Sequence, residues 1–208
     1  MRNEAPGFIT ICFKNVTKLI LLNIFFLMCC LPVVTLPAAT TALARTCQDI
    51  LLEKERPYRS FFRTIRQDFF PSLLLGLVFM VLPTALAYTV LFYISQTDSF
   101  LAVLCAVFSF IVDYLLLCTG TVALNIFARI ELPVYHIIRN AFIITFSAPK
   151  LLCTWISLSI LLVGMGVWFF PYSLPYVALL AFSLSGMAAS RGVLPYILEK
   201  MERNTWNE

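Results

Sequence analysis

Four polar side chains lie in or beside long apolar stretches of this sequence, and they limit the chemistry that it can offer. Asp113 lies within SFIVDYLLL, Arg45 follows an apolar run, and Asn23 and Asn125 lie deep in two such runs. An ionisable residue inside a membrane span is a candidate for binding a solute or moving a proton. Asp113, Arg45, Asn23 and Asn125 are therefore the intramembrane polar candidates around which a carrier or channel cavity would form.

Asp113 admits three interpretations. It is a neutral anchor hydrogen-bonded to a neighbouring hydroxyl, a partner of Arg45 across the bundle, or a proton or solute site. At a helix rise of about 1.5 Å per residue, the depths of Asp113 and Arg45 differ by about 8 Å, so Arg45 would have to extend most of its length. A lone carboxylate without a second acid or nearby His makes a poor proton relay, and we favour the anchor. For Asn23 and Asn125 we expect helix-to-helix amide hydrogen bonds.

Patterns typical of enzymes, metal sites and nucleotide sites are absent from the sequence. It contains no G-x-S-x-G, no H-E-x-x-H and no P-loop, and acid–base catalysis needs titratable partners within reach of one another. The seven Cys form no C-x-x-C pair, and the single His, His136, is far from any Cys in sequence. A zinc site needs about four clustered ligands. We expect no catalytic residue, no cofactor and no metal, and hence a protein that is not an enzyme.

The composition identifies the fold class. Hydrophobic residues make up 61% of the chain and charged residues 12%, whereas a soluble domain is about 45–50% apolar and about 25% charged. The excess of apolar side chains must face lipid, which predicts an all-α integral membrane helical bundle forming a single domain over residues 1–208. The 15 Lys and Arg lie in four separate clusters rather than in the continuous basic stripe of a nucleic-acid binder.

Uncharged stretches of about 20 residues or more mark the expected membrane spans. They run over 19–44, 69–97, 99–128 apart from Asp113, and 151–190. The last stretch is long enough for two spans, which FFPYSLP divides. Five spans follow directly, and a sixth depends on whether LPVVTLP, Leu31–Pro37, is a turn or only a kink.

The distribution of basic residues favours a turn at Leu31–Pro37. A kink would leave three cations outside against twelve inside, whereas a turn brings all fifteen to the cytoplasmic side, as the positive-inside rule requires. One objection is that Arg45 would lie roughly 12 Å below the outer surface, where a charge costs on the order of 2.5–3.5 kcal/mol. Asp49, four residues on, has the opposite charge and would soften that cost. Five spans with the amino terminus outside remain the alternative.

With a turn at Leu31–Pro37, the chain divides into three consecutive helical hairpins. They would give six membrane helices, the second of them short. Each hairpin is preceded by a segment that mixes Lys or Arg with aromatic and Ile residues, a pattern that suits a helix at the headgroups. The expected units span approximately 8–56, 57–128 and 129–198, followed by a charged tail over 199–208.

Asn23, LPVVT at Leu31–Thr35 and TTALA at Thr40–Ala44 carry a resemblance to a known family. In these motifs, and in FFRTIRQDFFPSLLLG and IIRNAFIITFSAPKLL further on, the chain resembles the YesL-like family of bacterial multi-pass membrane proteins. The resemblance extends over essentially the whole chain, and the family has no assigned activity and no catalytic residue to carry over.

The YesL-like resemblance also implies a cellular setting. Members of the family often accompany genes for carbohydrate uptake through binding-protein-dependent sugar transporters. It therefore implies a multi-pass protein of the bacterial cell membrane, with the carboxyl terminus and, given the turn, the amino terminus in the cytoplasm. The expected function is that of a non-enzymatic accessory that binds a membrane partner such as a transporter permease. The alternative is a small-solute carrier or channel around Asp113, and the oligomeric state stays open.

Overall fold

The computed structural model describes residues 7–54, 57–95, 100–130, 132–147, 150–169 and 171–203. Across these residues the chain is helical and contains no strand. The elements are α1 (Phe8–Lys14), α2 (Val16–Cys30), a 3₁₀ turn η1 (Val33–Thr35), α3 (Leu36–Leu51), α4 (Pro57–Gln67), α5 (Phe69–Ile94), α6 (Phe100–Phe127), α7 (Val134–Ser147), α8 (Lys150–Trp168), α9 (Leu174–Tyr176), a π-helical turn η2 (Val177–Ala181) and α10 (Phe182–Arg203). The all-α fold class is confirmed.

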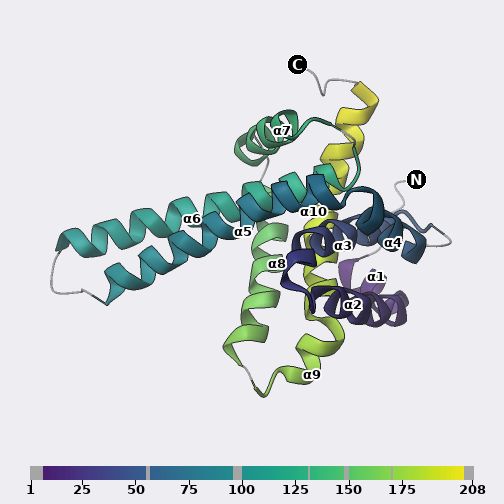
Figure 1. Ribbon diagram of the computed structural model, residues 1–208, viewed down its shortest axis with the longest axis horizontal. Helices are drawn as coiled ribbons and strands as arrows, with labels where there is room; N and C mark the ends of the chain where they lie inside the picture. The colour runs from purple at the N-terminus through teal and green to yellow at the C-terminus, as the bar shows by residue number, and fades with distance from the viewer. Residues whose placement is uncertain are drawn as a thin grey trace.

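Three helical hairpins make up most of the structure. They are α2 with α3, α5 with α6, and α8 with α10, and the helices of each pair contact one another (Figure 1). A short helix precedes each hairpin, namely α1, α4 and α7. The axis turns by 76° from α1 to α2 and by 109° from α7 to α8. These steep bends suit short helices that lie at the membrane surface while their successors enter the bilayer.

The segment Leu31–Pro37 is a turn. Its 3₁₀ turn Val33–Thr35 separates α2 from α3, and α3 returns to contact α2 (Figure 1). The hydroxyl of Thr35 donates to the carbonyl of Pro32 at 2.7 Å and also to that of Cys29, which closes the end of α2. Pro37 lies in the first turn of α3, where the missing N–H of proline costs no helical hydrogen bond.

Among the described residues, three helices are long and apolar enough to cross a membrane by themselves. They are Phe69–Ile94, Phe100–Phe127 and Leu174–Met201. The bent pairs α1 with α2 and α7 with α8 raise the count to five if each is one span. Helix α3, with 16 residues, is about 24 Å long and falls short of a hydrocarbon core of about 30 Å. It is therefore the short second helix that the sequence predicts, and it is buried inside the bundle.

Helix α3 is the centre of the packing. Twelve of its sixteen residues are buried, and α2, α4, α5, α6 and α10 all contact it. Small residues allow this close packing. A Cβ on Gly76 of α5 would lie 2.4 Å from the Cβ of Pro37, and one on Gly186 of α10 would lie 3.2 Å from the Sγ of Cys47. Two glycines on neighbouring helices therefore set how closely α5 and α10 approach α3.

The α5–α6 hairpin extends away from the rest of the molecule, crosswise to α8 and α10 (Figure 1). Only 22% of the apolar window of α5 and 11% of that of α6 are buried, against 56% for the α10 span. In α5 no residue after Pro83 is buried. The outer half of this hairpin therefore presents its apolar side chains to the surroundings, and its inner half holds it to the bundle.

Candidate functional site

Asn23 of α2 is fully buried and uses both ends of its amide on the third hairpin. Its Nδ2 donates to the carbonyls of Val177 and Ala178 at 2.9 and 2.8 Å, and its Oδ1 accepts the backbone N–H groups of Phe182 and Ser183, each at 3.1 Å. A π-helical turn leaves backbone groups without their usual i→i+4 partners. Asn23 satisfies those groups and thereby fixes the irregular start of α10 against α2.

Asn125 of α6 is at the centre of a second polar cluster. Its Oδ1 accepts from the Nε2 of Gln48 at 3.1 Å and from the Oγ of Ser190 at 3.0 Å. The same Nε2 donates to the backbone carbonyl of Asn125 at 2.9 Å, and the Nδ2 of Asn125 donates to Thr121 of its own helix. All three side chains are buried, so this cluster joins α3, α6 and α10 by amide and hydroxyl hydrogen bonds.

Arg45 makes neither of the contacts that the sequence suggests. Its guanidinium donates to the backbone carbonyl of Ala128, directly after α6, and its Nε is buried without a hydrogen-bond partner. The i, i+4 pairing of Arg45 with Asp49 is wrong, because Asp49 is held by other cations. Arg45 therefore acts as a backbone clamp between α3 and the end of α6.

Asp49 instead forms a two-cation centre at the end of α3. Its Oδ1 lies 2.9 Å from the Nη1 of Arg129 and 2.8 Å from the Nζ of Lys54. The side chain of Asp49 is 4% exposed and that of Arg129 is 13% exposed. An ion pair removed from water to this extent is costly to break on one side only. This pair thus links the end of α3 to the loop after α6.

Asp113 stands apart from the other three candidates. Its Oδ1 is buried and has no hydrogen-bond partner among the described residues. This atom therefore makes neither the hydrogen bond to a neighbouring hydroxyl nor the contact with Arg45 that the sequence suggests. Its neighbour Tyr114 instead bonds Ser157 of α8, with 2.7 Å between the two hydroxyl oxygens. The structure therefore separates the four sequence candidates into three places, around η2, around α3, and along α6.

The polar side chains described above are used mainly in contacts between helices. No group of three or more His, Cys, Asp or Glu that could hold a metal is found within the described ranges. Asn23, Arg45, Asp113 and Asn125 line neither the two apolar grooves of the α5–α6 hairpin, nor the pocket beside α1 and α10, nor the groove between Tyr114 and α8. Most hydrogen bonds of Asn23 and Asn125 are directed at neighbouring helices, which makes them structural links.

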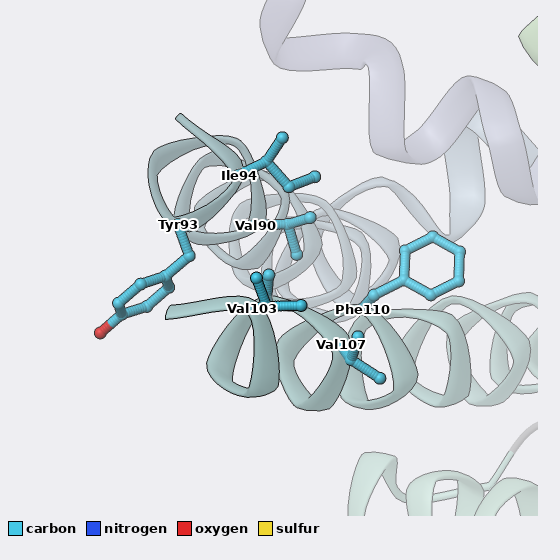
Figure 2. Close-up of a pocket in the computed structure, with 7 residues that line it drawn as sticks. Val90, Tyr93, Ile94, Val103, Val107 and Phe110 are labelled. Carbon is cyan, nitrogen blue, oxygen red and sulfur yellow. The ribbon is translucent and has the colours of Figure 1, made fainter. Parts of the chain in front are cut away.

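Two apolar grooves flank the outer part of the α5–α6 hairpin. The first has a volume of about 290 Å³ and runs between the helices, with Val90 of α5 facing Val103 of α6 and with Tyr93 and Phe110 at opposite ends (Figure 2). The second, of about 580 Å³, shares Tyr93 and Val107 with it and extends along Phe108. Aromatic and β-branched side chains line both grooves. The hairpin therefore has an apolar, grooved surface into which the side chains of another helix can pack.

Gln48 and Ser190 are the residues of the polar cluster that sequence reasoning did not select. In the sequence, Gln48 differs as a polar residue from a helical segment otherwise rich in Ala and Thr, and this contrast is the signal that could identify it. Ser190 gave no comparable signal, because a single Ser next to Ala residues is typical of close helix packing. Only the tertiary arrangement shows that α3 brings Gln48 to Asn125 and that α10 brings Ser190 to it.

Residues 19–90 match the profile of a family described as "Protein of unknown function, DUF624". YesL-like proteins belong to this family. The resemblance noted from the motifs is thus confirmed over these residues, for a membrane family of unassigned activity. The DUF624 segment runs from α2 into α5 and contains Asn23, Arg45, Gln48 and Asp49. No curated protein and no solved structure matches the chain.

Proposed function

We propose that this protein is a non-enzymatic integral membrane accessory that binds another membrane protein through the outer part of its α5–α6 hairpin. The observation that carries the proposal is the exposure of that hairpin. Phe108 is 68% exposed and Leu104 57% exposed, next to grooves lined by apolar side chains. Helices associate in lipid by packing their side chains into such grooves.

The internal polar residues support a binding role rather than a transport role. Asn23 and the Gln48–Asn125–Ser190 cluster hold helices together through hydrogen bonds of 2.9–3.1 Å. Asp49 is paired with Arg129 and Lys54. A carrier usually exposes such groups to a solute near the midplane, whereas here helix contacts use them.

The partner we propose is a permease of a bacterial carbohydrate-uptake system. The YesL-like resemblance supports this choice, since such proteins often accompany sugar-transporter genes. The proposed setting is the bacterial cell membrane, with both termini in the cytoplasm. The distribution of the fifteen basic residues supports that orientation.

The test is co-purification from bacterial membranes in mild detergent, with two matched variants. The hairpin variant combines Phe108→Ala with Leu104→Ala, and the control combines Leu161→Ala with Met165→Ala on α8, where exposure is 55% and 49%. We expect a sugar-transporter permease to be enriched with the wild type and the control, and to fall at least about fivefold with the hairpin variant. Equal recovery with both variants, or no recurrent membrane partner, would contradict the proposal.

A small-solute carrier is the second candidate, and one observation favours it. The Oδ1 of Asp113 is buried without a partner among the described residues, and unpaired acids in spans often serve ion or solute binding. If the protein carries protons or a solute, then Asp113→Asn in proteoliposomes abolishes a measurable flux. A protein that shows no flux above that of empty vesicles removes this candidate.

A further inference from the structure

We propose that the pocket between α1, the end of α3, α8 and α10 binds the phosphate headgroup of an anionic phospholipid, with Lys14 and Arg191 contacting the phosphate. This site is independent of the partner surface on the α5–α6 hairpin. The pocket has a volume of about 840 Å³, and none of the motifs described above accounts for it.

The pocket combines two basic side chains with apolar walls. Lys14 and Arg191 line it together with Ile50 and Leu194, which are 2% and 7% exposed. A free anion gains nothing from apolar walls, whereas an amphiphile places its phosphate at the cations and its acyl chain along the walls. Basic pockets between membrane helices are a recurrent way to hold anionic lipid headgroups.

Aromatic rings place the pocket at the depth of the headgroups. The guanidinium carbon of Arg191 lies 5.5 Å from the ring centroid of Trp155, and the ring of Phe8 lies 4.9 Å from that of Trp155. Trp is enriched where a membrane meets water, because its ring is apolar and its N–H is polar. A Cβ on Gly192 would lie 2.7 Å from the Cβ of Trp155, so α10 approaches closely enough to hold the ring beside Arg191.

Glu53 at the rim of the pocket has an unusual backbone. Its φ is 52°, in the left-handed region where glycine is normally found after a helix. Its N–H donates to Ile50 and the N–H of Lys54 donates to Asp49, which completes the helix-ending motif. From this backbone position, the Oε1 of Glu53 lies 2.8 Å from the Nζ of Lys14.

The Lys14–Glu53 contact leaves Lys14 open to competition. The two side chains are 69% and 74% exposed, and an exposed ion pair of this kind is weak. A phosphate that reaches Lys14 can replace Glu53, because it brings more negative charge and several acceptor oxygens. Glu53 thus lowers the affinity for anions and holds Lys14 near the pocket when no lipid is bound.

The experiment uses the quenching of Trp155 fluorescence by lipids with brominated acyl chains. The full chain carries Trp168→Phe and Trp206→Phe, so that Trp155 is the only Trp of the three. The protein is reconstituted into phosphatidylcholine vesicles with increasing amounts of brominated phosphatidylglycerol or brominated phosphatidylcholine. We expect saturable quenching with half-saturation at a lower fraction of the anionic lipid than of the zwitterionic one.

Three single substitutions make the test specific. Lys14→Gln and Arg191→Gln raise the half-saturating fraction of anionic lipid about fivefold each, the effect of one basic residue near a membrane surface. Glu53→Gln lowers it. Arg59→Gln, which removes an exposed cation on α4 outside the pocket, leaves it unchanged. Because the side chain of Lys14 is exposed, Lys14→Gln should leave folding intact. It therefore tests the site even if Arg191→Gln impairs folding.

Three results would overturn the proposal. Equal quenching by the two lipids would mean that Trp155 senses bulk lipid only. The same shift from Arg59→Gln as from Lys14→Gln would mean that total surface charge, not this pocket, attracts the lipid. Displacement of the brominated anionic lipid by millimolar inorganic phosphate would mean that the site recognises a free phosphate.

Discussion

The Oδ1 of Asn23 accepts the backbone N–H of Ser183 at 3.1 Å, across 160 residues of sequence. This contact fastens the first hairpin to the third, just where the π-helical turn passes into α10. The amide of Asn23 also donates to two carbonyls of the same turn. A single side chain thus stabilises a backbone irregularity that the rest of the fold would otherwise leave unsatisfied.

Replacing Asn23 should destabilise the protein strongly. Asn23→Ala leaves buried backbone groups of the turn without partners, and we expect a loss of about 2–4 kcal/mol. Asn23→Asp should be at least as harmful, because it loses both donors and places a carboxylate beside two carbonyls. Equilibrium unfolding in mixed detergent micelles measures both.

Asn15 provides the matched control for Asn23. It is buried as well, but its side chain donates to the carbonyl of Ile11 four residues earlier. Asn15→Ala should therefore cost about 1 kcal/mol or less. Equal losses at Asn15 and Asn23 would mean that the link between α2 and the π-helical turn contributes nothing special.

Two glycines should respond differently to replacement by alanine. A Cβ at Gly76 would lie 2.4 Å from the Cβ of Pro37, whereas a Cβ at Gly164 would meet nothing within 4 Å. Gly76→Ala should cost about 1–3 kcal/mol, because α5 and α3 would be forced apart. Gly164→Ala should be neutral or should stabilise α8 by up to about 1 kcal/mol. Thermal unfolding of the purified variants decides this, and a destabilised Gly164→Ala would contradict the packing described here.

The sequence predicted the helical membrane bundle, the turn at Leu31–Pro37 and the amide hydrogen bonds of Asn23 and Asn125. These depend on local signals, namely apolar runs, paired prolines and isolated amides in apolar helices. The order of basic residues along the chain was enough to favour the turn over the kink. Physical rules that act within about 20 residues were therefore sufficient for this level of description.

The partners of the polar residues could not be predicted in the same way. Asp49 pairs with Arg129 at a separation of 80 residues, and the i, i+4 neighbour Arg45 turns instead to Ala128. Neither choice is encoded locally, because both depend on which face of α3 meets the end of α6. The π-helical turn that Asn23 supports leaves no recognisable pattern in VALLA.

Removal of Asp113 should leave stability unharmed. Because its Oδ1 has no partner among the described residues, Asp113→Leu replaces an unpaired polar group by an apolar one and should be neutral or stabilising. Asp49→Leu, in contrast, strands Arg129 and should cost about 3 kcal/mol. Both are measured by the same unfolding assay, and a loss above about 1 kcal/mol for Asp113→Leu would reveal a structural partner.

From the turn at Leu31–Pro37 we predict an amino terminus in the cytoplasm. A unique Cys introduced as Asn3→Cys, with the seven native Cys replaced, should resist an impermeant maleimide in intact cells and react once the cells are opened. The reason is that the returning α3 brings the basic loop after it to the same side as Lys14 and Lys18. Labelling in intact cells would restore the alternative with an external amino terminus.

Site-specific photocrosslinking in living cells shows what the outer α5–α6 hairpin contacts. A photoreactive phenylalanine analogue is placed at Phe108 on the outer α5–α6 hairpin or at Leu161 on α8, both of which are well exposed. We expect position 108 to crosslink to a sugar-transporter permease in living cells and position 161 not to do so. If both positions yield only lipid adducts, the hairpin faces lipid alone and the proposed accessory role is contradicted.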